Sequence, residues 1–197
     1  ENDGNLAAYS EYLQHFKKDY KNLIMLTFGT GIGGGIIHNS KIFKGSGNAG
    51  EIGRILINNN TYLEDVISAK AWTKKCQELH EQNQNTKLSK IFFEEKVGSL
   101  LFDRSIDFED HEKLARDEII KQTSNALVSL FELFDNDIFV VGGSMTKSPY
   151  DFISLIDEYI NKNFDFPNRD FPKIQLSKAR EDSGLLGAAL LALNSEK

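Results

Sequence analysis

Apolar and polar residues follow two different periods along this chain, and each period predicts one kind of element. Short apolar runs rich in branched and aromatic residues, such as 23–28 and 138–141, are typical of buried strands. Shorter runs bounded by glycine, asparagine or serine indicate further strands. The strands predicted in this way cover residues 23–28, 36–38, 41–43, 55–57, 138–141 and 174–176.

Longer segments with apolar residues three and four positions apart predict helices between these strands. Residues 112–134 form the longest of them, and Asp135-Asn136-Asp137 is expected to stop it. The other predicted helices cover 3–16, 49–54, 61–67 joined with 69–79, 88–101, 151–164 and 183–193. Small residues such as Gly187 in the last helix favour close packing against a sheet. We find no repeat and no internal boundary, so we expect a single α/β domain over 1–197 with a mixed sheet flanked by helices.

A glycine-rich turn follows the first predicted strand and is the strongest candidate for chemistry. Five glycines occur within 29–35, and Ile36 and Ile37 follow them rather than a helix. Glycine allows positive φ, so consecutive backbone N–H groups can point into one concavity and hold phosphate oxygens. The context excludes a dinucleotide fingerprint and a P-loop, because both place a helix after the glycines. A tight hairpin or bulge without a ligand is the alternative interpretation.

Three further places in the chain carry residues that could serve a ligand, and each also has a plainer structural interpretation. Gly142 and Gly143 end a buried strand, where a ligand can approach the backbone, although a simple strand-to-helix turn would also use them. Asp3 lies near a helix start, where a carboxylate often caps backbone N–H groups. Glu51 and Arg54 would share one side of a helical turn, and a surface ion pair would explain them equally well.

Composition and charge exclude several classes of function. The 197 residues carry a formal net charge of −6, which argues against nonspecific binding to nucleic acid or to an anionic membrane. Cys76 is the only cysteine in the sequence, so it cannot form a disulfide framework or a cysteine-based zinc cluster, and a reducing cytoplasm fits best. No run of residues is long and apolar enough to be a membrane span. The first residue is Glu1 rather than Met, so we expect the chain to be part of a longer polypeptide.

Four segments, taken in order, resemble the ROK family of repressors, open reading frames and sugar kinases, within the actin-like ATPase (ribonuclease H-like) superfold. The resemblance covers nearly the whole chain. The first segment is similar to the family's catalytic Asn-Asp-Ala-Asn motif, the second to its glycine signature, the third to its adenosine-side strand and the fourth to its final helix. These segments are Asn2-Asp3-Gly4-Asn5, Gly29 to Gly35 with Gly50-Glu51-Ile52-Gly53, Val140-Val141-Gly142-Gly143 and Gly184-Leu185-Leu186-Gly187.

The resemblance implies a role for each candidate residue. Asp3 would be the general base that accepts the proton of the sugar hydroxyl as it attacks the γ-phosphoryl group of ATP. The substrate-binding residues would be Asn2, Glu51, Arg54 and Glu64. The ATP-binding residues would be Gly29, Thr30, Gly31, Gly33, Gly142 and Gly143. Mg²⁺ would accompany ATP, with a hexose or an amino sugar as acceptor.

The chain also departs from the family pattern. Arg54 stands where the family has a histidine that contacts both sugar and zinc, and Asn58-Asn59-Asn60-Thr61-Tyr62 replaces its cysteine-rich zinc loop. We therefore predict no structural zinc. The N-terminal lobe, with its Asp-x-Gly-x-Thr phosphate loop, is absent from this chain, so we expect only a C-terminal lobe that is inactive in isolation.

Three functions remain open from the sequence. The leading one is the C-terminal lobe of an ATP-dependent sugar kinase in the cytoplasm, with the N-terminal lobe and a homodimer as expected partners. The second is the sugar-sensing domain of a ROK transcriptional repressor, in which this lobe itself would not contact nucleic acid. The third is a degenerate actin-like domain that serves only in protein interaction.

Overall fold

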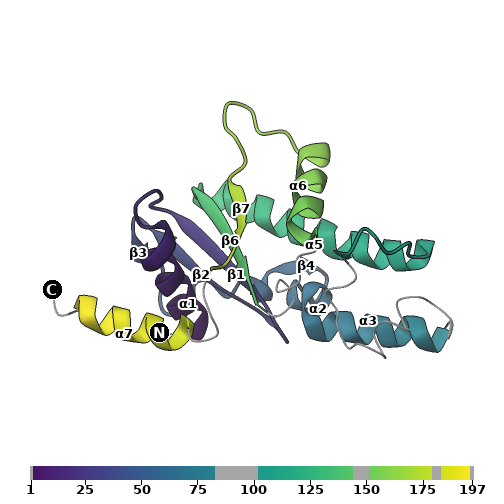
Figure 1. Cartoon of the computed structure of the whole chain (residues 1–197), viewed down its shortest axis with the longest axis horizontal. Helices are drawn as coiled ribbons and strands as arrows, with labels where there is room; N and C mark the ends of the chain where they lie inside the picture. Colours follow the sequence, from purple (N-terminus) through teal and green to yellow (C-terminus); the bar gives the residue numbers. More distant parts are fainter. Residues whose placement is uncertain (1, 83–101, 144–150, 179–182, 196–197) are drawn as a thin grey trace.

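The computed structural model describes residues 2–82, 102–143, 151–178 and 183–195. The helices are α1 (Asp3–Glu11), α2 (Glu64–Ile67), α3 (Ala69–Gln82), α5 (Asp110–Phe134), α6 (Phe152–Asn163) and α7 (Ser183–Ser195). Two short turns complete them, a π-helical one at Tyr12–Phe16 and a 3₁₀ one at Ile52–Arg54. In Figure 1, α1 and α7 lie together on one side of the strands, and α5 and α6 lie on the other.

One five-stranded sheet organises these helices. Its order is β3-β2-β1-β6-β7, in which β2 is antiparallel to both β3 and β1, while β6 is parallel to β1 and β7. A separate hairpin joins β4 and β5. The predicted mixed sheet flanked by helices is therefore confirmed. The strand bounds are β1 (Leu23–Phe28), β2 (Ile32–His38), β3 (Lys41–Ile42), β4 (Leu56–Asn58), β5 (Thr61–Tyr62), β6 (Ile138–Gly142) and β7 (Lys173–Leu176).

The alternation of side chains along the central strands gives the sheet two buried faces. In β1, Leu23 and Met25 pack with α1, whereas Ile24, Leu26 and Phe28 belong to the larger core under α5 and α6. Both faces of β1 and β6 are apolar, as expected for strands at the centre of a sheet that is covered on both sides. Burial on both faces of the sheet therefore explains why residues 23–28 and 138–141 are continuous apolar runs.

Glycines allow helix α1 to lie directly on the backbone of β2. A Cβ atom built on Gly4 would lie 2.3 Å from the carbonyl oxygen of Gly34, and one built on Gly35 would lie 2.6 Å from the Cβ of Ala8. Gly187 plays the same part between helices, because its Cβ would lie 2.0 Å from the carbonyl oxygen of Leu6. Helix α7 therefore packs closely against α1 at this point, and not against a sheet as the sequence predicted.

A buried carboxyl group fixes the other end of α1. Glu11 is fully buried, and its two carboxyl oxygens accept hydrogen bonds from the Ser177 hydroxyl at 3.0 Å and the Lys178 N–H at 2.7 Å. Both donors lie just after β7, across the sheet from β2. Helix α1 is thus held to β2 by close backbone contact and to the end of β7 by hydrogen bonds.

Most helix predictions are confirmed, the one over 49–54 is limited to the 3₁₀ turn at Ile52–Arg54, and one is wrong. The longest described helix is α5, and Asp135 ends it in the left-handed conformation with φ of 46°. The segment predicted as one helix from 61 instead forms β5, then α2, then α3, because Ser68 has an extended backbone between the two helices. The Ser68 hydroxyl accepts a hydrogen bond from the Ala71 N–H at 3.1 Å at the start of α3. The predicted helices at 88–101 lie outside the described residues.

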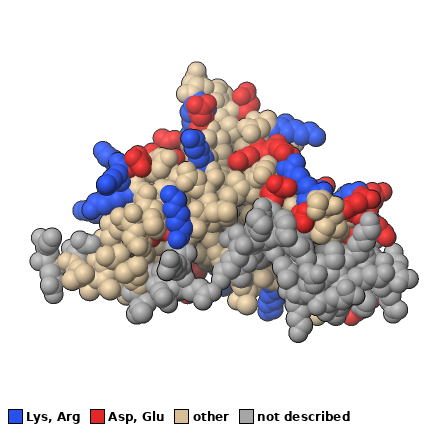
Figure 2. Space-filling model, viewed as in Figure 1, with Lys and Arg blue, Asp and Glu red and all other residues tan. Residues whose placement is uncertain are grey.

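Charges of both signs are interspersed on the surface that Figure 2 shows. Several of them are paired, for example Arg104 with Asp151 and Glu158. In the described part of the chain, no helix combines the length and the apolar character that crossing a membrane would need.

Candidate active site

A cavity of about 510 Å³ lies where the start of α1, the turn between β1 and β2, and the end of β6 meet. Seven of the predicted site residues line it, from segments far apart in the sequence. They are Asp3, Gly29, Thr30, Gly31, Gly33, Glu64 and Gly143. Its size suits a small-molecule ligand, for which sites are typically about 300–1,000 Å³.

The turn that opens this cavity is shorter than the sequence suggested. Strand β2 begins at Ile32, which pairs with Phe28, so only residues 29–31 form the turn. The Gly29 N–H donates to the Gly31 carbonyl oxygen at 3.0 Å, and the Gly29 carbonyl accepts from the Ala69 N–H at 2.9 Å. The turn is therefore fixed to the start of α3.

The reason for the glycines in this run is steric and does not lie in φ. The described glycines with positive φ are Gly45, Gly47, Gly50 and Gly143, so the left-handed backbone expected within 29–35 is wrong. At Gly31, an added Cβ would lie 3.0 Å from Glu64 Oε2, and at Gly33 it would lie 2.7 Å from Thr27 Oγ1. Glycine at these two positions leaves room for polar side chains at the cavity wall.

Gly143 is a position where only glycine fits. Its φ is +102°, and a Cβ atom there would lie 2.3 Å from the carbonyl oxygen of Phe28. The end of β6 can therefore approach the end of β1 closely at the cavity. Gly142, its predicted partner, pairs in register with Thr27 and does not line the cavity, because an added Cβ there would point toward Ser177 and Met25.

Asn2, and not Asp3, caps helix α1. The Asn2 side-chain oxygen accepts a hydrogen bond from the Asn5 N–H at 2.8 Å, whereas Asp3 is the first residue of the helix and is exposed. The Asp3 carboxyl accepts only the adjacent Gly4 N–H, at 2.9 Å, among its described hydrogen bonds. The interpretation of Asp3 as the cap is therefore wrong, and its carboxyl group lines the cavity.

The other two predicted carboxylates, Glu51 and Glu64, have different surroundings near the start of α1 and the cavity. Glu51 Oε1 accepts a hydrogen bond from Asn2 Nδ2 at 3.0 Å, which links the 3₁₀ turn to the start of α1. Glu64 lines the cavity, and its Oε2 lies beside the Cα atoms of both Gly31 and Gly53, where an added Cβ would be 3.0 and 3.3 Å away. The structure thus brings Asn2 and Glu51 together at one side and places Glu64 at the cavity.

Arg54 does not line the cavity. Its guanidinium lies over the Tyr62 ring, 4.5 Å from the ring centroid, and its side chain is exposed. The surface ion pair with Glu51 considered from the sequence does not form among the described residues, since Glu51 bonds to Asn2 instead. The predicted role of Arg54 in substrate binding therefore receives no support from this geometry.

The segment around Arg54 does not fit a zinc site. Zinc takes cysteine sulfur, histidine nitrogen or carboxylate oxygen, and the Arg54 guanidinium remains protonated and cannot coordinate it. Within the described residues, no group of three or more such side chains is arranged to hold a metal ion.

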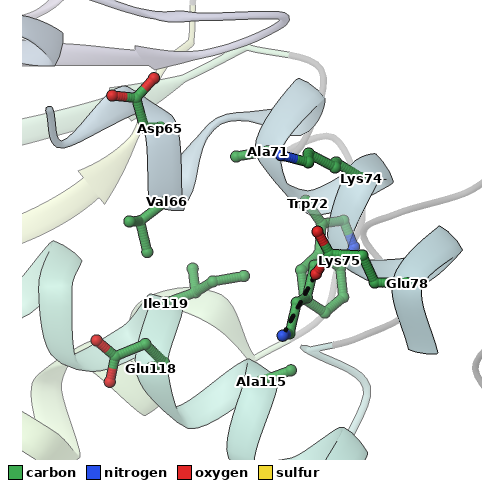
Figure 3. A pocket seen from close by; sticks show the side chains of 10 residues that line it. All are labelled: Asp65, Val66, Ala71, Trp72, Lys74, Lys75, Glu78, Ala115, Glu118 and Ile119. Carbon is green, nitrogen blue, oxygen red and sulfur yellow. Dashed lines mark ion pairs between the residues drawn. The ribbon is translucent and has the colours of Figure 1, made fainter. Parts of the chain in front are cut away.

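Two more cavities help to delimit the site. One of about 740 Å³ adjoins the first through Thr30, Gly31 and Glu64, and it adds Lys70 and Lys74 from α3. Another of about 280 Å³ lies between α2, α3 and α5, and Figure 3 shows its mixed apolar and charged lining. It contains none of the predicted site residues. Most of the residues predicted from the sequence therefore line the first cavity, and Thr30, Gly31 and Glu64 line the adjoining one as well.

Sequence reasoning missed some residues of the site. Thr27 lines the cavity from β1, and its hydroxyl, in an otherwise apolar strand just before the glycines, was the available signal. Lys70 and Lys74 belong to a helix predicted only for its apolar face. Among the described residues outside this cavity, the hydrogen bond to Glu158 raises the pKa of Arg104, and burial raises the pKa of Asp157.

A protein family whose model matches almost the entire chain accounts for these site segments. The model of the ROK family matches residues 1–195. The chain belongs to the ROK family. Known structures agree with the fold: a ROK family glucokinase from Streptomyces griseus, solved with glucose and AMPPNP, superposes with a TM-score of 0.81 at 23% identity, over 98% of this chain and 67% of that one.

Sequence relatives include both enzymes and a regulator. An N-acetylmannosamine kinase from Haemophilus influenzae is 27% identical over 199 residues, which covers 95% of this chain and 60% of the relative. A xylose repressor from Staphylococcus xylosus is 42% identical over 84 residues, which covers 38% of this chain and 22% of the repressor. The chain spans about three fifths of the length of the first relatives it matches.

Proposed function

We propose that this chain supplies the catalytic base and the phosphoryl-donor cradle of an ATP-dependent sugar kinase that acts on a hexose or an amino sugar. One observation supports this most strongly: the Asp3 carboxyl group, which is not the helix cap, lines the same cavity as Gly29, Gly31 and Gly143. The kinases among the relatives agree with it. The part of the site that this chain does not provide is assigned to an N-terminal lobe.

In this proposal Asp3 accepts the proton of the attacking sugar hydroxyl. Phosphoryl transfer needs little covalent chemistry from the protein, so positioning and charge stabilisation carry most of the catalysis. A carboxylate next to the reacting hydroxyl supplies the general base. Its position at the first residue of α1 fits this role, because the helix is anchored at both ends by β2 and by the end of β7.

The donor phosphates are assigned to the turn at 29–31 and the end of β6. Glycine permits close approach of an anion to the backbone because it has no side chain, and Gly29, Gly31 and Gly143 all reach the cavity. The Thr30 hydroxyl adds a donor at the same wall. Mg²⁺ would accompany ATP, held by the substrate phosphates and its own waters, and would neutralise charge on the phosphates, while Asp3 remains assigned to the proton and Glu64 to the sugar.

The acceptor sugar is assigned to the side where Asn2, Glu51 and Glu64 lie. Amide and carboxyl groups pair well with sugar hydroxyls, and a site of this kind rejects analogues that leave its polar groups unpaired. The hydrogen bond between Asn2 and Glu51 fixes both side chains before a sugar arrives. Because Asn2 is adjacent to Asp3, the sugar would lie next to the base.

The test replaces Asp3 with Asn. Asn retains the size and the hydrogen bonding of Asp but cannot accept the proton, so turnover should fall about 10²- to 10⁴-fold with sugar affinity largely kept. The assay measures ADP release that depends on both ATP and sugar, in the chain alone and in the chain carrying an N-terminal lobe. Equal turnover of wild type and Asp3→Asn, both carrying the N-terminal lobe, would exclude Asp3 from catalysis.

Asp110→Asn provides the matched control. Asp110 is also exposed and is the first residue of its helix, α5, but it lies outside the cavity. Its replacement should leave turnover within about twofold of wild type, because a surface substitution of this kind changes little beyond helix-end electrostatics. A parallel fall in both variants would attribute the Asp3 effect to the helix and not to proton transfer.

The second candidate is the sugar-sensing domain of a ROK repressor, which the similarity to the xylose repressor favours. A sensor needs the acceptor side of the site but no proton acceptor. It would bind a hexose, a pentose or an amino sugar through Asn2, Glu51 and Glu64, without ATP-dependent turnover. Sugar binding by calorimetry with no ADP release from the longer form would favour this function over the kinase.

A further inference from the structure

The hairpin that connects the two acceptor-side carboxylates is closed by a cation–π contact. Arg54 directly follows Gly53 in the 3₁₀ turn, and Tyr62 is the last residue of β5. The Arg54 guanidinium lies 4.5 Å from the centroid of the Tyr62 ring. In the described part of the chain, the Arg54 side chain has no hydrogen bond or ion pair, so this contact with the ring is its principal interaction.

This contact lies between Glu51 and Glu64 along the chain. Glu51 is three residues before Arg54, and Glu64 is two residues after Tyr62. The strands between them are very short: β4 and β5 pair through Leu56 with Tyr62 and Asn58 with Thr61, with a register shift. Two-stranded hairpins of this length are marginal in water by themselves. An additional contact across the hairpin therefore affects where both carboxylates lie.

Hydrogen bonds next to this contact link the hairpin to Glu64, which lines the cavity. The Leu63 N–H donates to the Ile55 carbonyl at 2.8 Å, and the Tyr62 N–H donates to Asp65 Oδ2 at 2.9 Å. Leu63 is fully buried, and the next residue is Glu64, whose Oε2 lies beside Gly53. A shift of Tyr62 would move this buried anchor and the Glu64 carboxyl with it.

We infer that the stacking of Arg54 on Tyr62 is the clamp that holds the acceptor side of the site in place, in the segment where the family resemblance leads one to expect a zinc loop. Arg54 is thus a positioning residue and not a ligand of the sugar. The inference about Glu51 and Glu64 rests on the proposed function, whereas the clamp itself does not. The clamp needs no metal, consistent with the lack of fit of this segment to zinc.

The first measurement is amide hydrogen exchange of residues 55–63 in the chain as it stands. Arg54→Gln removes the cation and Tyr62→Leu removes the ring. Each should speed exchange of the Leu63 amide about two- to fivefold, the change expected for an exposed cation–π pair. The double variant should exchange no faster than either single one, because both substitutions remove the same contact. Tyr62→Phe, which keeps the ring, should match wild type.

Arg169→Gln is the matched control. Arg169 also lies over an aromatic ring, 4.3 Å from the centroid of Phe131, in the segment between α6 and β7 and not in the hairpin. Its loss should leave exchange at 55–63 unchanged. Unchanged exchange in both Arg54→Gln and Tyr62→Leu, or effects that add in the double variant, would overturn the clamp. So would bound zinc whose removal by a chelator speeds exchange in this hairpin.

Kinetics separate the clamp from the proposed function. If both hold, Arg54→Gln and Tyr62→Leu raise KM for the sugar about two- to fivefold, with KM for ATP and kcat within twofold of wild type, and Arg54→Lys restores most of the sugar affinity. Faster exchange at 55–63 without any change in sugar KM or sugar binding would leave the clamp standing and would remove Glu51 and Glu64 from the acceptor site.

Discussion

Gly29 and Gly35 belong to one glycine-rich run, yet their surroundings are opposite. A Cβ atom on Gly29 would meet only the Gly31 carbonyl oxygen, at 3.9 Å, and the residue borders the cavity. A Cβ atom on Gly35 would lie 2.6 Å from the Cβ of Ala8 and 2.7 Å from the Gly4 carbonyl oxygen. The first half of the run therefore faces a cavity, and the second half is covered by α1.

This difference shows why counting glycines misleads. The density of the run suggested a phosphate cradle, but Gly34 and Gly35 are needed for packing whether or not a ligand binds. A Cβ atom on Gly34 would lie 2.7 Å from Ile52 Cδ1 of the 3₁₀ turn, and one on Gly35 would meet helix α1. Only Gly29, Gly31 and Gly33 remain available for a ligand at the cavity. The same packing places Asp3 at the cavity, because α1 begins where it crosses Gly34. The packing half of the run thus positions the residue assigned to catalysis.

Gly35→Ala should have the largest effect. The added methyl group meets backbone and Ala8 atoms that cannot move aside without shifting α1, so the free energy of unfolding should fall by about 3 kcal/mol, at the upper end of overpacking. Gly29→Ala adds the same methyl group where there is space, so the free energy of unfolding should change by less than about 0.5 kcal/mol. Urea denaturation of the two variants measures the difference, and equal losses of stability would show that Gly29 and Gly35 have equally crowded surroundings.

Glu11→Ala tests the other anchor of α1. Glu11 is buried, and removing its carboxyl group deletes both hydrogen bonds to the segment after β7, so the free energy of unfolding should fall by about 2 kcal/mol. The exposed Glu118 is the control, and Glu118→Ala should cost less than about 0.5 kcal/mol. A negligible effect at Glu11 would leave close backbone contact as the dominant anchor of α1.

Local periodicity predicted the central fold well. The apolar runs of β1 and β6 are buried on both faces, so the apolar composition of each run was enough to predict a strand. Helix α5 combines a long apolar stripe with a stop at Asp135, and both signals are local. The family resemblance added the order of the site segments, which the family match and the cavity then supported.

Features decided by contacts distant in sequence could not be predicted in this way. Asn2 and Asp3 are both good helix caps, and only the packing of α1 selects Asn2. Thr61 and Tyr62 read as the start of a helix, because their pairing with Asn58 and Leu56 leaves no periodic trace in two residues. Glu11 did carry a local signal, since it interrupts the apolar stripe of α1, but its partners after β7 are more than 160 residues away.

Gly31→Ala tests the half of the run that borders the cavity. Its Cβ would meet Glu64 Oε2 at 3.0 Å, which is the movable end of a side chain, so stability should change by less than about 0.5 kcal/mol. The displaced carboxyl group should still raise KM for the sugar by up to about tenfold, because small errors of position at a reacting site are costly. A large loss of stability in urea with unchanged KM would place Gly31 in the packing half of the run.

The smallest effect is expected far from both halves of the run, at Asp157 on α6. Burial raises the pKa of its carboxyl group, so the folded state holds this proton more tightly than the unfolded state does. The resulting contribution to stability is present at pH values below the ordinary pKa of Asp and is lost as pH rises through the raised pKa.

Asp157→Asn, which is uncharged at every pH, should therefore have the same urea midpoint as wild type at about pH 3 and a slightly higher one at about pH 7. The gain is small because Asp157 is only half-buried and solvent screens its charge. A midpoint lower than wild type at neutral pH would show that the ionised carboxyl group stabilises α6, and turnover should remain unchanged throughout because this helix contributes nothing to the cavity.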